Sequence, residues 1–472
     1  MVAVAWKRKG AVLLPASLAA SAAWLGVTLS ATEATLKTVP SFLIVGTAAL
    51  LIIVERNWTH VEYLSPIVLS LAFYGLVFGV IPLVDVWFGN PATYHAAWPT
   101  VAWISWLGLL ILYLGFRVGM AVPGRGDAPA RDWLPGRARL AGVVLLTLAV
   151  GGATLQIGGV GGISGYIGRF SARRFLVGQQ ERVLILYAIT LATPAFLLVA
   201  GNWVWQPTRR RLVTLCVVWL PPGMLLSGML GQRVRALGLL ATVMTLYHFR
   251  RRRIRLPALT VLVAGLAAAF VLVAVYRNVA GTGASPRPIS GRLFYENYLA
   301  GPDFAYFRQF LTTFEGVPTH VSFQNGRTFL SLIPGTDFPT GGYVYSTTFA
   351  PAIYARGQGT SLSPSLPGEL YMNFGLPGVF MGLLLYGLVH GRIERYFRSR
   401  RSTIPGLLIY SYLIVPMAGL LRGDFRTYGG WALLSLGVLA VALRFVMRPR
   451  SAIQQSSRSR LAPSDMIMAR SH

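Results

Sequence analysis

The stretch EYLSPIVLSLAFYGLVFGVIPLV, residues 62–84, carries a single charged side chain, Glu62, at its first position. An α-helix of about 20 apolar residues is long enough to cross the roughly 30 Å hydrocarbon core of a bilayer. Apolar runs of similar length recur from one end of the chain to the other. The sequence therefore predicts an all-α, polytopic integral membrane protein.

The composition supports this fold class. Of 472 residues, 54% are hydrophobic and only 12% are charged, and the mean hydropathy is +0.56. Soluble domains carry roughly one quarter charged residues. These values exclude soluble enzymes and ordinary nucleic-acid binders, so the lipid bilayer is the first expected partner. The only cysteine, Cys216, excludes an intrachain disulfide and a cysteine metal cluster.

Twelve transmembrane helices are expected from the apolar runs. The predicted spans are residues 11–30, 39–54, 62–84, 98–118, 138–157, 184–202, 212–230, 236–249, 256–277, 367–390, 403–421 and 428–446. The eighth span is the shortest, and the topology after it depends on whether it crosses.

The distribution of basic residues orients these spans, because arginine and lysine concentrate in cytoplasmic loops. With both termini in the cytoplasm, 28 of the 43 basic residues and 6 of the 15 acidic residues fall on the cytoplasmic side. The cytoplasmic side then carries +22 of the total charge of +28, and the outer side +6. We expect one membrane domain, residues 1–450, in the cytoplasmic (inner) membrane, and a disordered cytoplasmic tail, residues 451–472.

Two long loops are predicted on the outer side, at about residues 158–183 and 278–366. Within the second loop, Phe304, Phe307, Phe310, Leu311 and Phe314 recur at helical spacing. An amphipathic helix of this kind lies either on the membrane surface or against the helix bundle.

Arginines on the outer side break the topology rule and therefore need another explanation. The first outer loop, GGVGGISGYIGRFSARRFLVGQQER (158–182), contains Arg169, Arg173 and Arg174 after a glycine-rich segment. Free backbone amides followed by guanidinium groups are the ingredients of a phosphate-binding loop. The alternative is a flexible loop with solvated charges.

Further arginines lie where spans end on the same side. They are Arg233 and Arg235 at the start of the eighth span, Arg277 at the end of the ninth, and Arg422 and Arg426 in the turn LLRGDFRTYGG (420–430), which also holds Asp424 and Tyr428. Arginine side chains at helix ends also extend to lipid headgroups, and the turn allows a local Arg–Asp pair. Cations from several separated segments nevertheless favour one shared anionic ligand.

The segment GQGTSLSPSLPGELYMNFG, residues 357–375, leads into the tenth span and places Glu369 in its first turn. An acidic residue in a first turn usually compensates the helix dipole, which is the reading that local sequence favours. A carboxylate at the edge of a membrane cavity is also suited to general-base catalysis. No P-loop, Asp-x-Asp pair or metal-spaced histidine cluster is present in the sequence, so no cofactor or metal is expected.

The chain from Leu225 to Phe380 resembles the Wzy-type oligosaccharide repeat unit polymerases, the family that includes O-antigen polymerases. The resemblance rests on SGMLGQR (227–233), NGRTFLSLIPG (325–335) and, most specifically, SLSPSLPGELYMNFGLPG (361–378). The first 140 residues resemble the family only in hydropathy.

The resemblance implies a metal-independent glycosyltransferase that moves a glycan from its polyprenyl diphosphate carrier onto an incoming lipid-linked repeat unit. Arg233 would act in catalysis by stabilising the diphosphate, and Glu369 or Asp424 would take the acceptor proton. Diphosphate and glycan would be bound by Arg169, Arg173, Arg174, Arg235, Arg277, Arg422, Arg426 and Tyr428. The implied partners are the lipid-linked oligosaccharide and, in the same pathway, a chain-length regulator and a flippase.

Two alternatives remain open at this point. A ligase that transfers finished glycan to another acceptor has the same hydropathy. A transporter or flippase for an anionic lipid-linked substrate would place ionisable residues near mid-membrane. The predicted spans are nearly free of charge, which favours catalysis at the outer face.

Overall fold

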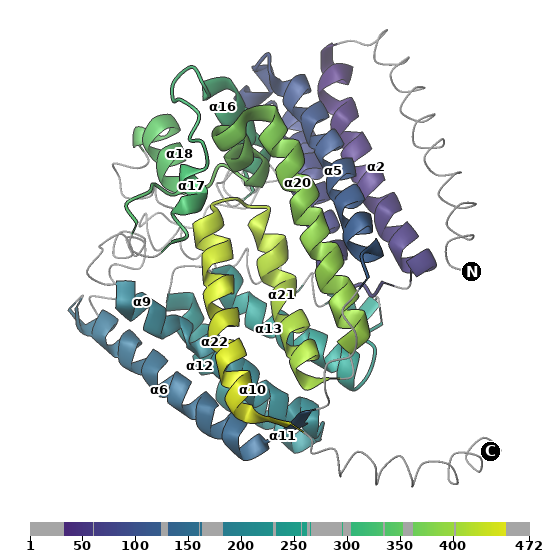
Figure 1. Ribbon diagram of the computed structural model, residues 1–472. Helices are drawn as coiled ribbons and strands as arrows, with labels where there is room; N and C mark the ends of the chain where they lie inside the picture. The colour runs from purple at the N-terminus through teal and green to yellow at the C-terminus, as the bar shows by residue number, and fades with distance from the viewer. Residues whose placement is uncertain are drawn as a thin grey trace, which may run out of the picture.

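A computed structural model of the chain describes residues 33–59, 61–123, 131–159, 161–162, 183–229, 233–255, 257–261, 265, 295, 304–333, 336–352, 362–400 and 403–449. Within these residues the protein is almost entirely helical, as predicted, and its one sheet has two short strands (Figure 1).

Seven helical segments are long and apolar enough to cross a membrane. They are α2 (Glu33–Thr59), the continuous α3–η1–α4 (Pro66–Tyr74, Gly75–Val80 and Ile81–Trp87), α5 (Trp98–Ala121), α6 (Pro135–Gly158), α9–α10 (Val183–Thr190 and Ala192–Trp205), α20 (Leu366–Arg400) and η7–α22 (Arg426–Gly430 and Trp431–Val446). They cover the predicted spans at 39–54, 62–84, 98–118, 138–157, 184–202, 367–390 and 428–446. The prediction of a multi-pass, all-α architecture is confirmed to this extent.

The other predicted spans have different outcomes. Span 403–421 forms α21 (Ile404–Leu420), an apolar helix that is shorter than the seven above. Span 212–230 is divided among α11 (Arg209–Thr214), η4 (Leu215–Trp219) and α12 (Leu220–Met229), and 236–249 lies in α13 (Arg233–Arg250). Span 11–30, most of 256–277 and the tail 451–472 lie outside the described residues, so the total of twelve stays a prediction.

Glycines allow α5 and α20 to touch backbone to backbone. Gly115 and Gly119 on α5 face Gly387 and Gly391 on α20, so each helix carries a pair of glycines four residues apart. A Cβ atom added at Gly387 would lie 1.9 Å from the carbonyl oxygen of Leu112. Small residues at this spacing permit close helix contact in membranes, where lipid removes the hydrophobic drive for association. The contact fixes α20, the longest helix, in the bundle.

A kink near the start of α20 creates the platform for the site. Gly375 adopts φ 66° and ψ −156° inside the helix, and the proline two residues later has no N–H to donate. The carbonyls of Met372 and Asn373, which lose their helical donors, accept hydrogen bonds from the N–H groups of Gln324 (2.9 Å) and Asn325 (3.1 Å). The predicted outer loop therefore pairs directly with the broken turn of α20.

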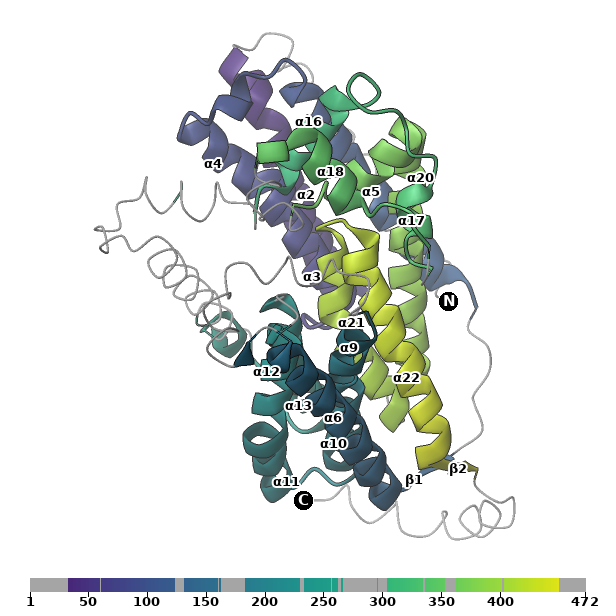
Figure 2. The ribbon, with the colours of Figure 1, turned by 90° about the vertical axis from the view of Figure 1, so that its left-hand side faces the viewer.

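Three short helices from that loop lie over one end of α20, α21 and α22 (Figures 1 and 2). They are α16 (Tyr306–Gly316), α17 (Arg327–Leu330) and α18 (Gly341–Phe349). On α16, Phe307, Phe310 and Leu311 are fully buried against the bundle. Of the two alternatives for this amphipathic helix, the structure shows packing against the bundle. A 3-10 turn, η2 (Pro91–Tyr94), lies between α4 and α5.

The opposite end gathers loops that the predicted topology assigns to the cytoplasm. Strand β1 (Arg131–Trp133) pairs antiparallel with β2 (Met447–Pro449), joining the α5–α6 connection to the end of α22. The Arg392 guanidinium donates to the carbonyl of Val122 at 3.1 Å, which ties α20 to the end of α5. Helix ends predicted on one side of the membrane therefore share one end of the molecule.

Candidate functional site

Two carboxyl side chains meet where α20 begins and α21 ends. Glu369, in the first turn of α20, is fully buried, and Asp424, in the turn between α21 and α22, is 5% exposed. The Oε2 atom of Glu369 accepts a hydrogen bond of 2.9 Å from the N–H of Phe425, the residue after Asp424. This bond joins the carboxylate to the turn between α21 and α22. Glu369 therefore links two segments in addition to compensating the dipole of its own helix.

The turn that holds Asp424 is formed by residues that accept a left-handed backbone. Gly423 has φ 78° and Asp424 has φ 57°. A Cβ atom at Gly423 would lie 2.4 Å from the carbonyl carbon of Ser365, so only glycine fits there. The N–H of Leu366 donates to the carbonyl of Leu421 at 3.1 Å. The start of α20 and the turn after α21 are therefore one interlocked unit.

The amino end of α18 covers both carboxyl groups. Cβ atoms added at Gly341 and Gly342 would lie 2.6 Å from Glu369 Oε1 and 2.7 Å from Asp424 Oδ2, respectively. Thr340 caps the helix by accepting from the N–H of Tyr343 at 3.1 Å. These glycines were not predicted from the sequence, although the threonine before them is a favoured residue at the start of a helix.

Asn373 joins the loop around α17 to the first turns of α20. Its Nδ2 atom donates to Thr328 Oγ1 and to the carbonyl of Glu369, both at 2.7 Å. Its Oδ1 atom accepts from the N–H of Gly326 at 3.0 Å. The segments 325–335 and 361–378, both quoted above for the family resemblance, are therefore in direct contact beside the carboxyl pair.

Of the predicted anion-binding arginines, Arg422 and Arg426 lie closest to the pair along the chain, each two residues from Asp424. The guanidinium group of Arg422 is 5.2 Å from the ring centre of Tyr306 and 5.5 Å from that of Tyr428. Tyr428 is held in turn, because its N–H donates to the carbonyl of Asp424 at 3.1 Å. Arg426, also partly buried, begins η7 in the same turn. The structure thus brings together five predicted site residues: Glu369, Arg422, Asp424, Arg426 and Tyr428.

Arg235 belongs to a neighbouring cavity that shares Tyr428. Its guanidinium group lies 4.6 Å from the ring centre of Trp431. The cavity, between α9–α10, α12, α13, α21 and α22, is also lined by Tyr412, Ser227 and the shared Tyr428. Arg235 therefore faces the interior of the bundle rather than lipid headgroups.

The remaining predicted site residues are not placed by the structure. Arg233 is the first residue of α13, but its side chain lies outside the described residues, as do Arg169, Arg173, Arg174 and Arg277. Most of the first outer loop, 158–183, also lies outside them. Among the described residues, no group of three or more His, Cys, Asp or Glu side chains can hold a metal ion.

A buried charge pair nearby was not anticipated from the sequence. Asp85, fully buried at the end of α4, lies 3.6 Å from Arg308 on α16 and accepts a hydrogen bond of 2.7 Å from the Tyr295 hydroxyl. Burial, together with this bond to the carboxylate, raises the pKa of Tyr295 to about 12. The tyrosine therefore remains a proton donor at neutral pH, and the Asp85–Arg308 pair links α4 to α16. The sequence signal for this charge pair was an acidic residue near the end of an apolar span.

Comparison of the chain with protein-family models, with curated proteins and with solved structures finds no match. Any statement about activity therefore depends on the residues and their arrangement.

Proposed function

We propose that the protein is a membrane glycosyltransferase, an oligosaccharide repeat unit polymerase that acts at the outer face of the cytoplasmic membrane. The observation that carries the proposal is the buried pair Glu369 and Asp424 with Arg422 in the same turn. A buried pair of carboxyl groups with arginines in the same turn supplies a proton acceptor and a cation for a leaving phosphate. The resemblance of segments 227–233, 325–335 and 361–378 to the Wzy-type family agrees with this chemistry.

In the proposed reaction, one carboxylate takes the proton of an acceptor sugar hydroxyl. The acceptor oxygen forms a bond to the anomeric carbon of the donor glycan as the bond from that carbon to the diphosphate oxygen breaks. The leaving polyprenyl diphosphate gains negative charge, which Arg422 and its neighbour Arg426 stabilise. Arg235, which lines the neighbouring cavity, is a further candidate for binding the diphosphate. The resemblance assigns the same role to Arg233, the first residue of α13.

A ligase reaction uses the same donor and bond cleavage but a different acceptor. The two activities are distinguished by supplying only lipid-linked repeat units, since a polymerase lengthens them and a ligase does not.

A transporter for an anionic lipid-linked substrate is the second candidate. His390 favours it, because this residue is buried within α20 and its Nε2 atom lies 2.9 Å from the Ser70 hydroxyl. Ionisable residues within membrane spans often belong to transport pathways.

The test uses the purified protein in liposomes with lipid-linked repeat units already in the outer leaflet. Products longer than one repeat, formed without transfer of lipid between leaflets, support the polymerase. Movement of the lipid across the bilayer without chain lengthening supports the transporter. No lengthening by correctly inserted protein, on any lipid-linked repeat offered from its own cells, would contradict the proposal.

A further inference from the structure

Two arginine-rich turns lie side by side at the end of the molecule opposite the carboxyl pair. One turn starts α11 at Arg209, and the other follows the end of α13 at Arg250. Arg251 donates through Nη1 to the carbonyl of Pro207 at 2.6 Å, and Arg250 donates through Nε to the carbonyl of Val204 at 2.8 Å. These bonds hold the turns together and leave other arginines of both turns pointing outward.

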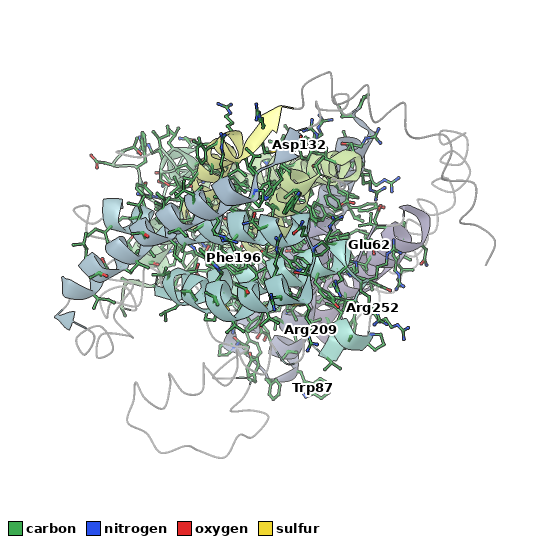
Figure 3. All side chains as sticks on the ribbon, turned by 90° about the horizontal axis from the view of Figure 1, so that it is seen from below. Glu62, Trp87, Asp132, Phe196, Arg209 and Arg252 are labelled. Atoms are coloured by element: carbon green, nitrogen blue, oxygen red, sulfur yellow. The ribbon has the colours of Figure 1, made fainter. Side chains whose placement is uncertain are left out.

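Four arginines of the two turns form what we call the basic patch: Arg209, Arg210, Arg252 and Arg255. All four are exposed, and no side-chain hydrogen bond or ion pair of theirs is found within the described part of the chain. The nearby carboxylate of Glu62 forms an ion pair with Arg253, in which Oε1 and Nη2 are 3.1 Å apart. Seen from below in Figure 3, Arg209 and Arg252 lie on one side of the molecule and Asp132 on the other. The patch therefore presents positive charge that the described residues do not neutralise.

An exposed apolar surface begins next to the patch. Val213, Val217 and Val218, one to two turns after Arg209, are 51%, 66% and 57% exposed. Trp205, just before the first turn, is 37% exposed and lies 5.4 Å from the guanidinium group of Arg211. Exposed valines next to a tryptophan and arginines are typical of the boundary between acyl chains and headgroups.

From this arrangement we propose that the basic patch binds an anionic phospholipid. Its phosphate group contacts the four guanidinium groups, and one acyl chain lies along Val213 and Val217. Charge alone also attracts soluble phosphate, but the apolar surface that continues from the patch matches a lipid and has no role with a soluble ion. The inference depends only on the membrane location of the chain and is independent of the proposed glycosyltransferase activity.

The experiment measures lipid bound to the purified full-length protein in detergent, by native mass spectrometry and by thermal stability. Phosphatidylglycerol, phosphatidylcholine and inorganic phosphate are titrated separately. The test variant replaces all four patch arginines with glutamine. The matched control replaces four other exposed arginines at the same end, with the same change in charge: Arg139, Arg395, Arg444 and Arg448.

Each arginine near an anionic surface contributes about 1 kcal/mol, or roughly a fivefold change in affinity. We expect the wild type and the control to retain phosphatidylglycerol and to be stabilised by it, and the test variant to bind it more than 100-fold more weakly. If that variant is not recovered folded, the pairs R209Q/R210Q and R252Q/R255Q should each weaken binding at least tenfold.

Three results would overturn the proposal. The first is that the control variant loses phosphatidylglycerol binding as much as the test variant does. The second is that the wild type binds phosphatidylcholine as tightly as phosphatidylglycerol. The third is that inorganic phosphate stabilises the protein as much as the lipid does. The last result would identify a soluble anion site instead.

Discussion

Replacing Gly387 with alanine tests whether α5 and α20 touch backbone to backbone. The added Cβ would lie 1.9 Å from the carbonyl oxygen of Leu112, whereas real Cβ contacts are essentially never under 3.0 Å, so the helices must separate by about 1 Å. Overpacking of this kind costs about 1–3 kcal/mol, occasionally more. Because a rigid backbone carbonyl is the obstacle, we expect the upper part of that range, about 3 kcal/mol.

The assay is thermal unfolding of the purified protein in detergent, with Gly151→Ala and Gly437→Ala as matched controls. Both control glycines are in helices, and a Cβ at either position has no atom within 4 Å apart from its chain neighbours and the backbone of its own helix. Alanine is favoured over glycine in helices by up to about 1 kcal/mol, so the controls should unfold at the same temperature as wild type or slightly higher. Gly387→Ala should unfold several degrees lower. Equal stability of Gly387→Ala and the controls would refute the close α5–α20 contact.

Three further substitutions test separate contacts. Asn373→Ala removes the buried acceptor of the Gly326 N–H and should destabilise the protein by about 1–3 kcal/mol. The loop around α17 should then be cleaved earlier in limited proteolysis. Unchanged proteolysis would contradict the assigned contact. Arg422→Lys keeps the charge but loses the planar guanidinium group, which lies 5.2 Å and 5.5 Å from the ring centres of Tyr306 and Tyr428. It should lower the free energy of unfolding by about 1–2 kcal/mol, and an unchanged free energy would exclude a cation–π role for this group. Glu55→Gln leaves Arg117, which is 2.7 Å from the buried Glu55 carboxylate, without its counter-charge. It should destabilise by about 3 kcal/mol, and recovery in a double variant that also replaces Arg117 with methionine would identify the pair as the cause.

The long helices were predictable because length and apolar composition alone determine whether a helix can cross a bilayer. The interrupted segments were harder. The stretch 209–229 changes helix type at η4, and the hydropathy of a run does not record such changes. The phenylalanine pattern of α16 predicted a helix but not its partner, since an apolar stripe suits a bilayer and a protein surface equally well.

The candidate site was predictable residue by residue but not as an arrangement. Glu369 and Asp424 were each identified from their local motifs, yet their proximity arises from contacts between segments far apart in the chain, which no local period encodes. Gly341 and Gly342 have no side chains, so a search for reactive groups passes over them. Their role appears only when the carboxyl oxygens they contact are known.

The same limit applies to Asn373. The sequence places it one turn after Glu369, but two of its three hydrogen bonds join it to Gly326 and Thr328, in the loop that also bonds to the carbonyls at the kink. The predicted span 367–390 did not include this break, although a glycine and a proline two residues apart were its sequence signal. The residues that donate hydrogen bonds to the carbonyl groups at this break are identified only by the structure.

The most direct test of the proposed function is chain lengthening by Glu369→Gln and Asp424→Asn variants in liposomes supplied with lipid-linked repeat units. Glu315→Gln is the control, because Glu315 is an acid of the same end of the molecule, partly exposed and paired with His95 at 2.7 Å. The proposal predicts that all three proteins insert and unfold normally, that the control lengthens chains at the wild-type rate, and that at least one of the two site variants loses chain lengthening by 100-fold or more, as expected when a general base is removed. Wild-type rates in both site variants would contradict the assignment of catalysis to this carboxyl pair.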